Sequence, residues 1–108
     1  MLKGVIVLVP FPFTDLSGNK VRPCVVLHDQ KGGEDCIVAF ISSAQQKKLP
    51  PYAVRIAKTI ANGLKVDSLI KTDKIATLQK KIILGELGKL ETSVARAVDG
   101  NLKKIFAL

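Results

Sequence analysis

The fold is decided by residues 21–43, which read VRPCVVLHDQKGGEDCIVAFISS. Two apolar runs, Val21–Leu27 and Cys36–Ile41, flank a Gly-Gly pair that has the backbone freedom a tight turn needs. The pattern predicts an antiparallel hairpin. Because the end of one hairpin strand lies beside the start of the other, Arg22 and Ser42 are predicted to be neighbours.

Strand signals continue on both sides of this hairpin. On the N-terminal side, Val5–Val9 is rich in β-branched residues, and the turn-rich segment Phe11–Lys20 follows as a long loop of the kind that often carries function. On the C-terminal side, Tyr52–Ile56 alternates in the manner of a strand and Ser68–Lys74 is expected to be extended. Ile75–Leu84 is expected to form short strands with at most one helical turn.

The last segment changes to helical spacing. Thr92 or Ser93 is expected to cap a helix. Its apolar face is predicted to consist of residues spaced three or four apart, namely Val94, Val98, Leu102, Ile105 and Phe106. Five or so short strands followed by one helix predict a mainly β fold, a small barrel formed by a single domain that spans residues 1–108.

Composition limits the classes of partner and compartment. The chain has 108 residues, with 17 Lys and Arg against 9 Asp and Glu and a net charge of +8, which favours a nucleic acid, an acidic protein segment or an anionic membrane surface as partner. No apolar stretch approaches the roughly 20 residues of a membrane span, so we expect a soluble, cytoplasmic protein. Cys24 and Cys36 lack the density of a disulfide scaffold and the spacing of a zinc site, and are expected to be buried thiols.

Arg22 is the strongest candidate for chemistry, because a planar guanidinium grips phosphate oxygens through two donors. A guanidinium beside the hydroxyl of Ser42 would suit a phosphodiester. The same sequence pattern also fits a surface arginine that merely starts a strand. Lys20, Lys47 and Lys48 on the adjoining loops add positive charge, or form an ordinary solvated face.

Other candidates are weaker. His28 lies four residues beyond Cys24, and about 13 Å along a strand excludes a Cys-His dyad. His28 stays a possible general base or a solvent-exposed strand end. The carboxylates of Asp29, Glu34 and Asp35 flank the Gly-Gly turn and are interpreted as solvated, so no metal site is predicted.

In this order the segments resemble the MazF/PemK family of toxins. The resemblance is carried by GVIVLV (4–9), PFTDLSG (12–18), RPCVVL (22–27) and IVAFISS (37–43). It continues through Gly63-Leu64, Asp67-Ser68, IATL (75–78) and GELG (85–88), and so covers nearly the whole chain. Its most specific part is the Arg-Pro pair coupled to the Ile-Ser-Ser strand end.

The resemblance implies an SH3-like β-barrel with helical additions, a homodimer, cleavage of single-stranded RNA without a metal or other cofactor, and an acidic antitoxin protein as partner. The family's catalytic arginine falls on Arg22 and its catalytic threonine on Ser42. Further contacts to RNA are expected from polar and basic side chains near these two, namely Thr14, Ser17, Lys20, Ser43, Gln45, Lys47 and Lys48.

Two positions depart from the family. The serine at position 42 keeps the hydroxyl of the family's threonine but lacks the methyl group that restricts its rotamer, and Leu16-Ser17-Gly18 replaces a loop glutamate. Without a metal, cleavage is expected to use the 2′-hydroxyl of the RNA as nucleophile. Two other functions stay open: a gyrase-directed toxin of the same fold class, and a non-catalytic basic barrel that binds RNA.

Overall fold

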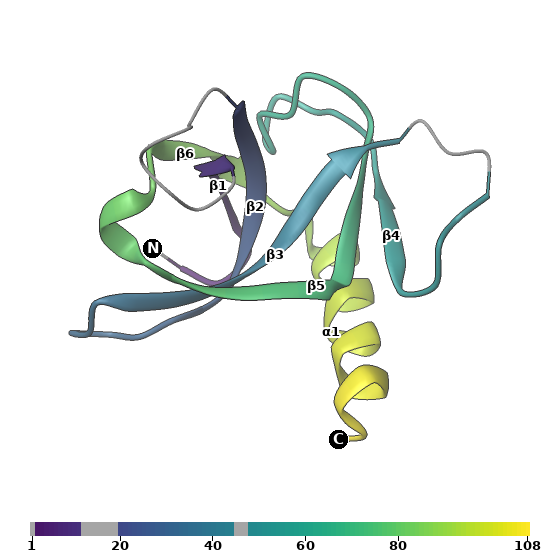
Figure 1. The fold of residues 1–108 in the computed structure, drawn as a ribbon. Helices are drawn as coiled ribbons and strands as arrows, with labels where there is room; N and C mark the ends of the chain where they lie inside the picture. Colours follow the sequence, from purple (N-terminus) through teal and green to yellow (C-terminus); the bar gives the residue numbers. More distant parts are fainter. Residues whose placement is uncertain (1, 12–19, 45–47) are drawn as a thin grey trace.

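The structure, a computed structural model, describes residues 2–11, 20–44 and 48–108 (Figure 1). The elements in chain order are β1 (Val5–Phe11), β2 (Lys20–Asp29), β3 (Asp35–Ser43), β4 (Ala53–Ile56), β5 (Ser68–Gln79), a 3-10 helix (Lys80–Ile82), β6 (Gly85–Lys89) and α1 (Thr92–Phe106). The expected mainly β fold with a C-terminal helix is confirmed.

The strands of the described residues form one antiparallel sheet in the order β4-β5-β3-β2-β1-β6, with the predicted hairpin β2–β3 at its centre. The sheet is strongly bent at β5. Ala39 of β3 lies opposite Ile75 of β5, but the next residue, Phe40, lies opposite Lys71. Residues 72–74 therefore form a bulge, at which β5 turns a corner (Figure 1).

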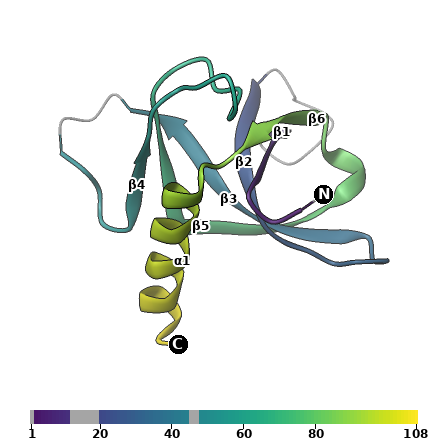
Figure 2. The same cartoon turned by 180° about the vertical axis from the view of Figure 1, so that it is seen from behind.

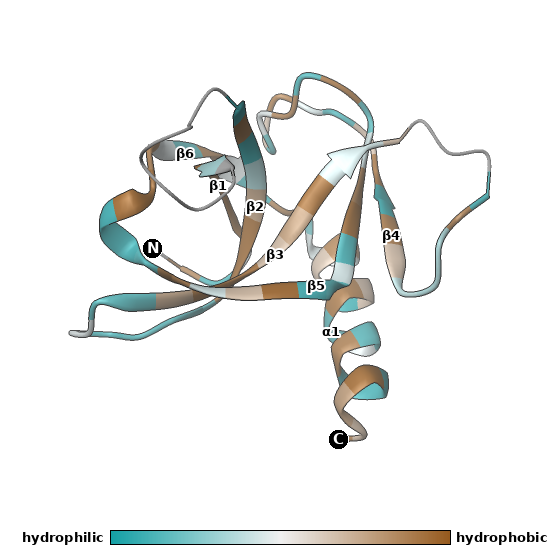
Figure 3. Cartoon of the chain, viewed as in Figure 1, coloured by the Kyte–Doolittle hydropathy of each residue, from teal (hydrophilic) through white to brown (hydrophobic). Residues whose placement is uncertain are grey.

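Two apolar clusters occupy the two faces of the sheet. Along β2, Val25 belongs to the first cluster and Cys24 and Val26 to the second, as the alternation of side chains requires. The central strands are thus buried on both faces, which explains why their sequences are continuous apolar runs (Figure 3). The helix α1 covers the first cluster through Val94, Val98 and Leu102, beside β4 and β5 (Figure 2).

The thiols of Cys24 and Cys36 are buried and free, as expected. Other expectations about the C-terminal segment need correction. Neither Thr92 nor Ser93 caps α1, because Glu91 is the N-cap residue and makes no side-chain capping hydrogen bond. Phe106 is 57% exposed, since the last turn of α1 extends past the sheet that the rest of the helix covers (Figure 2).

Two strand boundaries also differ from the sequence expectation. The fourth strand begins at Ala53, because Tyr52 has a positive φ of 61° and is not extended. The carbonyl of Tyr52 accepts hydrogen bonds from the backbone amide and the hydroxyl of the buried Thr72. β5 continues to Gln79, since its second half pairs with Asp35–Ala39 of β3. No helix among the described residues is long and apolar enough to span a membrane.

Candidate functional site

β2 and β3 carry two polar side chains at the edge of the second apolar cluster. The register of the hairpin pairs Cys24 with Phe40. The pairing of β2 with β3 ends there, and the two strands diverge beyond it (Figure 1). Two residues further along each strand, Arg22 and Ser42 lie on the face that Cys24 and Phe40 share. On the other side of β2, Arg22 is paired with Val9 of β1. The structure therefore brings together the two residues that the sequence predicts to be neighbours.

Arg22, Ser42 and Ser43 lie on a rim between two hollows. The first, here called the Lys65 hollow, has a volume of about 450 Å³ and is lined by Leu8, Val21, Arg22, Pro23, Ile41, Ser42, Ser43, Gly63, Leu64, Lys65, Val66, Ser68 and Leu87. The second, the Lys74 hollow, has a volume of about 470 Å³ and is lined by Val9, Arg22, Cys24, Phe40, Ile41, Ser42, Ser43, Lys71 and Lys74. An extended ligand lying across the rim would contact Arg22 and enter both hollows.

The charges of the two hollows have one sign. Arg22, Lys65, Lys71 and Lys74 contribute four cations, and none of the described residues that line either hollow is acidic. Lysine and arginine without a carboxylate partner favour an anionic ligand, and a guanidinium beside hydroxyl groups binds phosphate oxygens well. The arrangement is suited to a chain of phosphodiesters that extends on both sides of Arg22.

Cys24 lies in the floor of the Lys74 hollow, directly next to this rim. Burial, and to a smaller degree the neighbouring Cys36, raise the pKa of the Cys24 thiol to about 12. A thiol with such a pKa stays protonated at neutral pH, and only the thiolate is a good nucleophile. Cys24 therefore packs the floor of the hollow and does not supply a nucleophile.

The structure places the remaining predicted RNA-contact residues differently with respect to the two hollows. Ser43 lines both hollows. Lys20 at the start of β2 and Lys48 before β4 are exposed, and neither lines the two hollows. Four others lie outside the described residues, namely Thr14, Ser17, Gln45 and Lys47.

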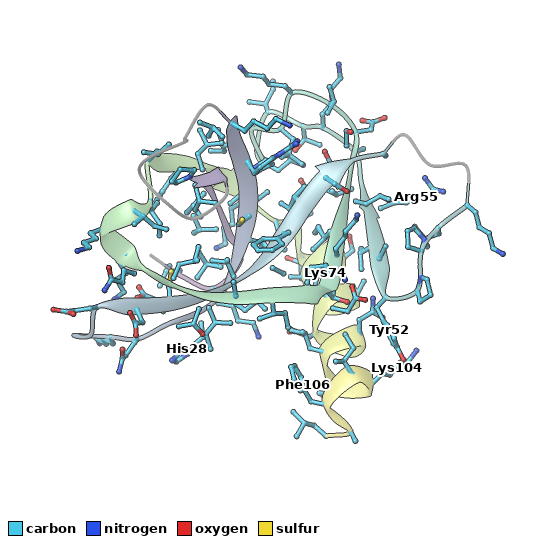
Figure 4. The ribbon with its side chains drawn as sticks, in the orientation of Figure 1. His28, Tyr52, Arg55, Lys74, Lys104 and Phe106 are labelled. Atoms are coloured by element: carbon cyan, nitrogen blue, oxygen red, sulfur yellow. The ribbon has the colours of Figure 1, made fainter. Side chains whose placement is uncertain are left out.

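The structure does not bring His28 to the rim. His28 lies at the opposite end of β2, paired with Ile37 near the hairpin turn, and six residues of strand correspond to about 20 Å from Arg22. Figure 4 shows His28 at the hairpin, away from Lys74. The imidazole of His28 is therefore too far away to form a hydrogen bond with a phosphate that Arg22 holds.

Asp29, at the same end of β2, forms an ion pair with Lys80, whose ammonium also donates to the carbonyl oxygen of Gln30 at 2.6 Å. The hydrogen bond from Lys80 lowers the pKa of the Asp29 carboxyl. In the part of the chain that the structure describes, no three side chains of His, Cys, Asp or Glu gather into a group able to hold a metal ion.

Three lysines of the site were missed by the sequence interpretation. Lys71 and Lys74 come from the bulged part of β5, and Lys65 from the loop that precedes it. The only local signal was the polar stretch KTDK (71–74), which interrupts the apolar alternation of β5. Such a stretch is typical of a strand end, whereas here it forms the corner of β5 next to Phe40 of β3.

The comparisons with known proteins agree with this fold. The family model described as PemK-like, MazF-like toxin of type II toxin-antitoxin system matches residues 2–106. A search of curated proteins gave no match.

Several solved structures share the fold at low sequence identity. An endoribonuclease in complex with its cognate antitoxin, from a mycobacterial species, has a TM-score of 0.77 at 16% identity, with 100% of this chain and 96% of that chain covered. The Mycobacterium tuberculosis toxin MazF-mt6 has a TM-score of 0.75 at 20% identity, covering 96% and 97%. A MazE-MazF structure from Deinococcus radiodurans has a TM-score of 0.77 at 18% identity, covering 98% and 94%.

Proposed function

Because the chain belongs to the PemK-like, MazF-like toxins of type II toxin-antitoxin systems, we propose that it is an endoribonuclease that cleaves single-stranded RNA without a metal ion. The observation that carries the proposal is that Arg22 and Ser42 both line the two cationic hollows and lie on the rim between them. A single strand that lies across the rim can extend a phosphate into each hollow, and its unpaired bases are free to contact the protein.

The reaction that these residues can support is an internal transesterification. The 2′-oxygen of the RNA attacks the adjacent phosphorus, the bond from phosphorus to the 5′-oxygen breaks, and overall one proton passes from the 2′-oxygen to the departing 5′-oxygen. The products are a 2′,3′-cyclic phosphate and a 5′-hydroxyl. DNA lacks the nucleophile, so only RNA is cut.

Arg22 stabilises the extra negative charge that develops on the phosphorus-bound oxygens, because its guanidinium is permanently protonated and offers paired donors. The hydroxyl of Ser42, on the same face of the sheet, donates to a second phosphate oxygen. Lys65, Lys71 and Lys74 attract the flanking phosphates and set the strand in register, without acting on the reacting atoms.

Two partners complete the proposal. The first is an acidic antitoxin, which the cationic rim is suited to receive in place of RNA, so that inhibition and substrate binding exclude each other. The second is another copy of the chain, because one copy leaves large apolar side chains in solvent, including Leu2, Leu84, Phe106 and Leu108. We place the activity in the cytoplasm, where such an RNA substrate is found.

The decisive experiment incubates the purified protein with an end-labelled single-stranded RNA in EDTA. Cleavage with a 2′,3′-cyclic phosphate is expected, and a 2′-deoxy substitution at the scissile nucleotide should abolish it. Arg22→Ala should lower the rate by at least about a hundredfold, with thermal unfolding within a few degrees of the parent, because removal of one pre-placed donor costs roughly a hundred- to a thousandfold. Arg96→Ala, on the exposed side of α1, is the matched control.

Other results of the RNA incubation would indicate other functions or contradict the proposal. RNA bound intact indicates a non-catalytic RNA-binding barrel, and RNA neither bound nor cut favours a toxin that acts on a protein such as gyrase. Activity that disappears in EDTA and returns with Mg²⁺ contradicts the metal-independent reaction. Cleavage at the parental rate by Arg22→Ala removes Arg22 from the site.

A further inference from the structure

The loop between β4 and β5, residues 57–67, is held rigidly by one buried side chain. Asn62 is 0% exposed, and its carbonyl oxygen accepts hydrogen bonds from the amides of Thr59 and Leu64, each at 3.0 Å. Its amide nitrogen donates to the carbonyl of Ala57 at 2.8 Å and to the carboxylate of Glu91 at 3.2 Å. In this segment, here called the Asn62 loop, one buried side chain therefore joins Ala57, Thr59 and Leu64 to one another and to Glu91.

The Asn62 loop is also docked tightly on β6. The amide of Lys89 donates to the carbonyl of Ala61 at 3.0 Å. A Cβ atom on Gly88 would lie 2.2 Å from that same carbonyl oxygen, and a Cβ atom on Gly63, which has a φ of +71°, would lie 2.2 Å from the carbonyl oxygen of Leu87. Glycine permits this close approach, so the loop is fixed in shape before any partner arrives.

On this fixed loop the side chain of Ile60 is fully exposed, and Val66 is 52% exposed. Lys58, Ile60 and Lys65 line a shallow hollow of about 540 Å³ with Thr59, Gly63 and Leu64. That hollow shares Gly63, Leu64 and Lys65 with the Lys65 hollow, so it adjoins the candidate site, whereas Ile60 lines only the hollow on the loop. Figures 1 and 2 agree that the loop lies at the same end of the sheet as the start of β2.

The charged side chains of the Asn62 loop that line the hollow, Lys58 and Lys65, are both positive, although the loop also carries the exposed Asp67. The carboxylate of Asp67 accepts a hydrogen bond from the amide of Lys58 at 3.0 Å, and the carboxylate of Glu91 accepts from the hydroxyl of Thr59 and from Asn62. Both carboxylates thus serve the loop itself, whereas Lys58 and Lys65 line the hollow beside Ile60. The hollow thus combines one exposed aliphatic side chain with two lysines and has no acidic residue among its described lining.

This chemistry selects among ligands. RNA phosphates would satisfy the lysines, but bases gain most from stacking on aromatic or guanidinium planes, which an isoleucine does not offer. A peptide with an apolar residue between carboxylates satisfies the lysines and buries the isoleucine as well. We propose that the Asn62 loop is a second docking point for the antitoxin, which inserts an apolar side chain of its acidic segment against Ile60. The proposal rests on the toxin role under Proposed function for the identity of the partner, but not on cleavage.

The test measures binding directly. The acidic protein encoded by the adjoining reading frame is titrated into the parent protein and into Ile60→Ser, with calorimetry as readout. Loss of one buried isoleucine contact corresponds to about a tenfold to hundredfold weaker Kd. Lys58→Glu should also weaken binding, and the factor by which it raises the Kd should be larger at low salt than at high salt. The matched control is Leu108→Ser, which removes another exposed aliphatic side chain, 90% exposed, at the far end of α1.

Ile60→Ser should also cleave RNA at the parental rate and keep the parental size in light scattering. An unchanged Kd for Ile60→Ser, or an equal loss for Leu108→Ser, overturns the docking point. Slower RNA cleavage by Ile60→Ser would assign the loop to RNA, and a smaller particle would assign it to a second copy; both contradict the proposal. If the parent protein binds this partner but cuts no RNA, the nuclease function fails while the calorimetric comparison still decides about the loop.

Discussion

Ser42 and Ser43 are neighbours in sequence, and only Ser42 is predicted to take part in RNA cleavage. Ser42 is half-buried and lies with Phe40 on the face of the sheet that also carries Arg22, whereas Ser43 is exposed and belongs to the alternate face with Ile41. A hydrogen bond to a charged group contributes about 1.5 to 3 kcal/mol. Ser42→Ala should therefore slow cleavage by about tenfold to hundredfold, and Ser43→Ala by less than about threefold.

The assay is single-turnover cleavage with enzyme in excess over RNA, because it separates the chemical step from substrate binding and product release. Ser42→Thr provides the matched positive variant, since the added methyl group restricts the rotamer of the hydroxyl and should keep or raise the rate. Thermal unfolding of all three variants checks that the fold is intact. A strongly impaired Ser43→Ala with a near-parental Ser42→Ala would show that the catalytic role assigned to Ser42 is wrong by one residue.

Three further outcomes follow from other parts of the structure. Gly63→Ala should lower stability by more than about 1 to 2 kcal/mol, because its positive φ and the carbonyl of Leu87 both exclude a Cβ atom, whereas Gly100→Ala in α1 should stabilise the protein slightly; thermal melts compare them. Asp29→Asn should destabilise the protein at pH 7 but not near pH 2. The hydrogen bond from Lys80 lowers the pKa of Asp29 on folding, so the unfolded chain binds more protons and the stabilisation is lost as the pH falls below about 4. Denaturant titrations at several pH values measure this loss. Light scattering at micromolar concentration should give twice the 11.7 kDa of the chain, and a monomer would contradict the dimer.

The parts of the fold that were predicted correctly are those with local signals. The hairpin β2–β3 follows from two apolar runs around a Gly-Gly turn, and α1 follows from the spacing of Val94, Val98 and Leu102. The C-terminal limit of β5 was not predictable in this way, because its alternation is interrupted by a bulge whose position depends on pairing with β3. The polar residues 71–74 are typical of a strand end, whereas β5 turns a corner there and continues.

The basic residues of the candidate site show the same limit. Lys20 and Lys48 are near the hairpin ends in sequence, which predicts that they contact RNA, yet they do not line the hollows beside Arg22. Lys71 and Lys74 are distant in sequence and line the Lys74 hollow, because β5 pairs with β3 and its bulge lies next to Phe40, which lines the same hollow. Strand order decides which lysines surround the rim, and a single sequence gives little information about strand order.

One irregularity of the hairpin decides which serine faces Arg22. Near the turn, His28 is paired with Ile37, and if that register continued along the strands, Arg22 would lie opposite Ser43. A bulge between Val26 and His28 shifts the pairing by one residue, so that Cys24 lies opposite Phe40, and Arg22 and Ser42, two residues further along each strand, share one face. Because side chains alternate, this shift also moves the facing hydroxyl from one side of the sheet to the other. The placement of the guanidinium and the hydroxyl on one face thus depends on a bulge more than 10 Å away along the strand, in a part of the hairpin that touches neither hollow.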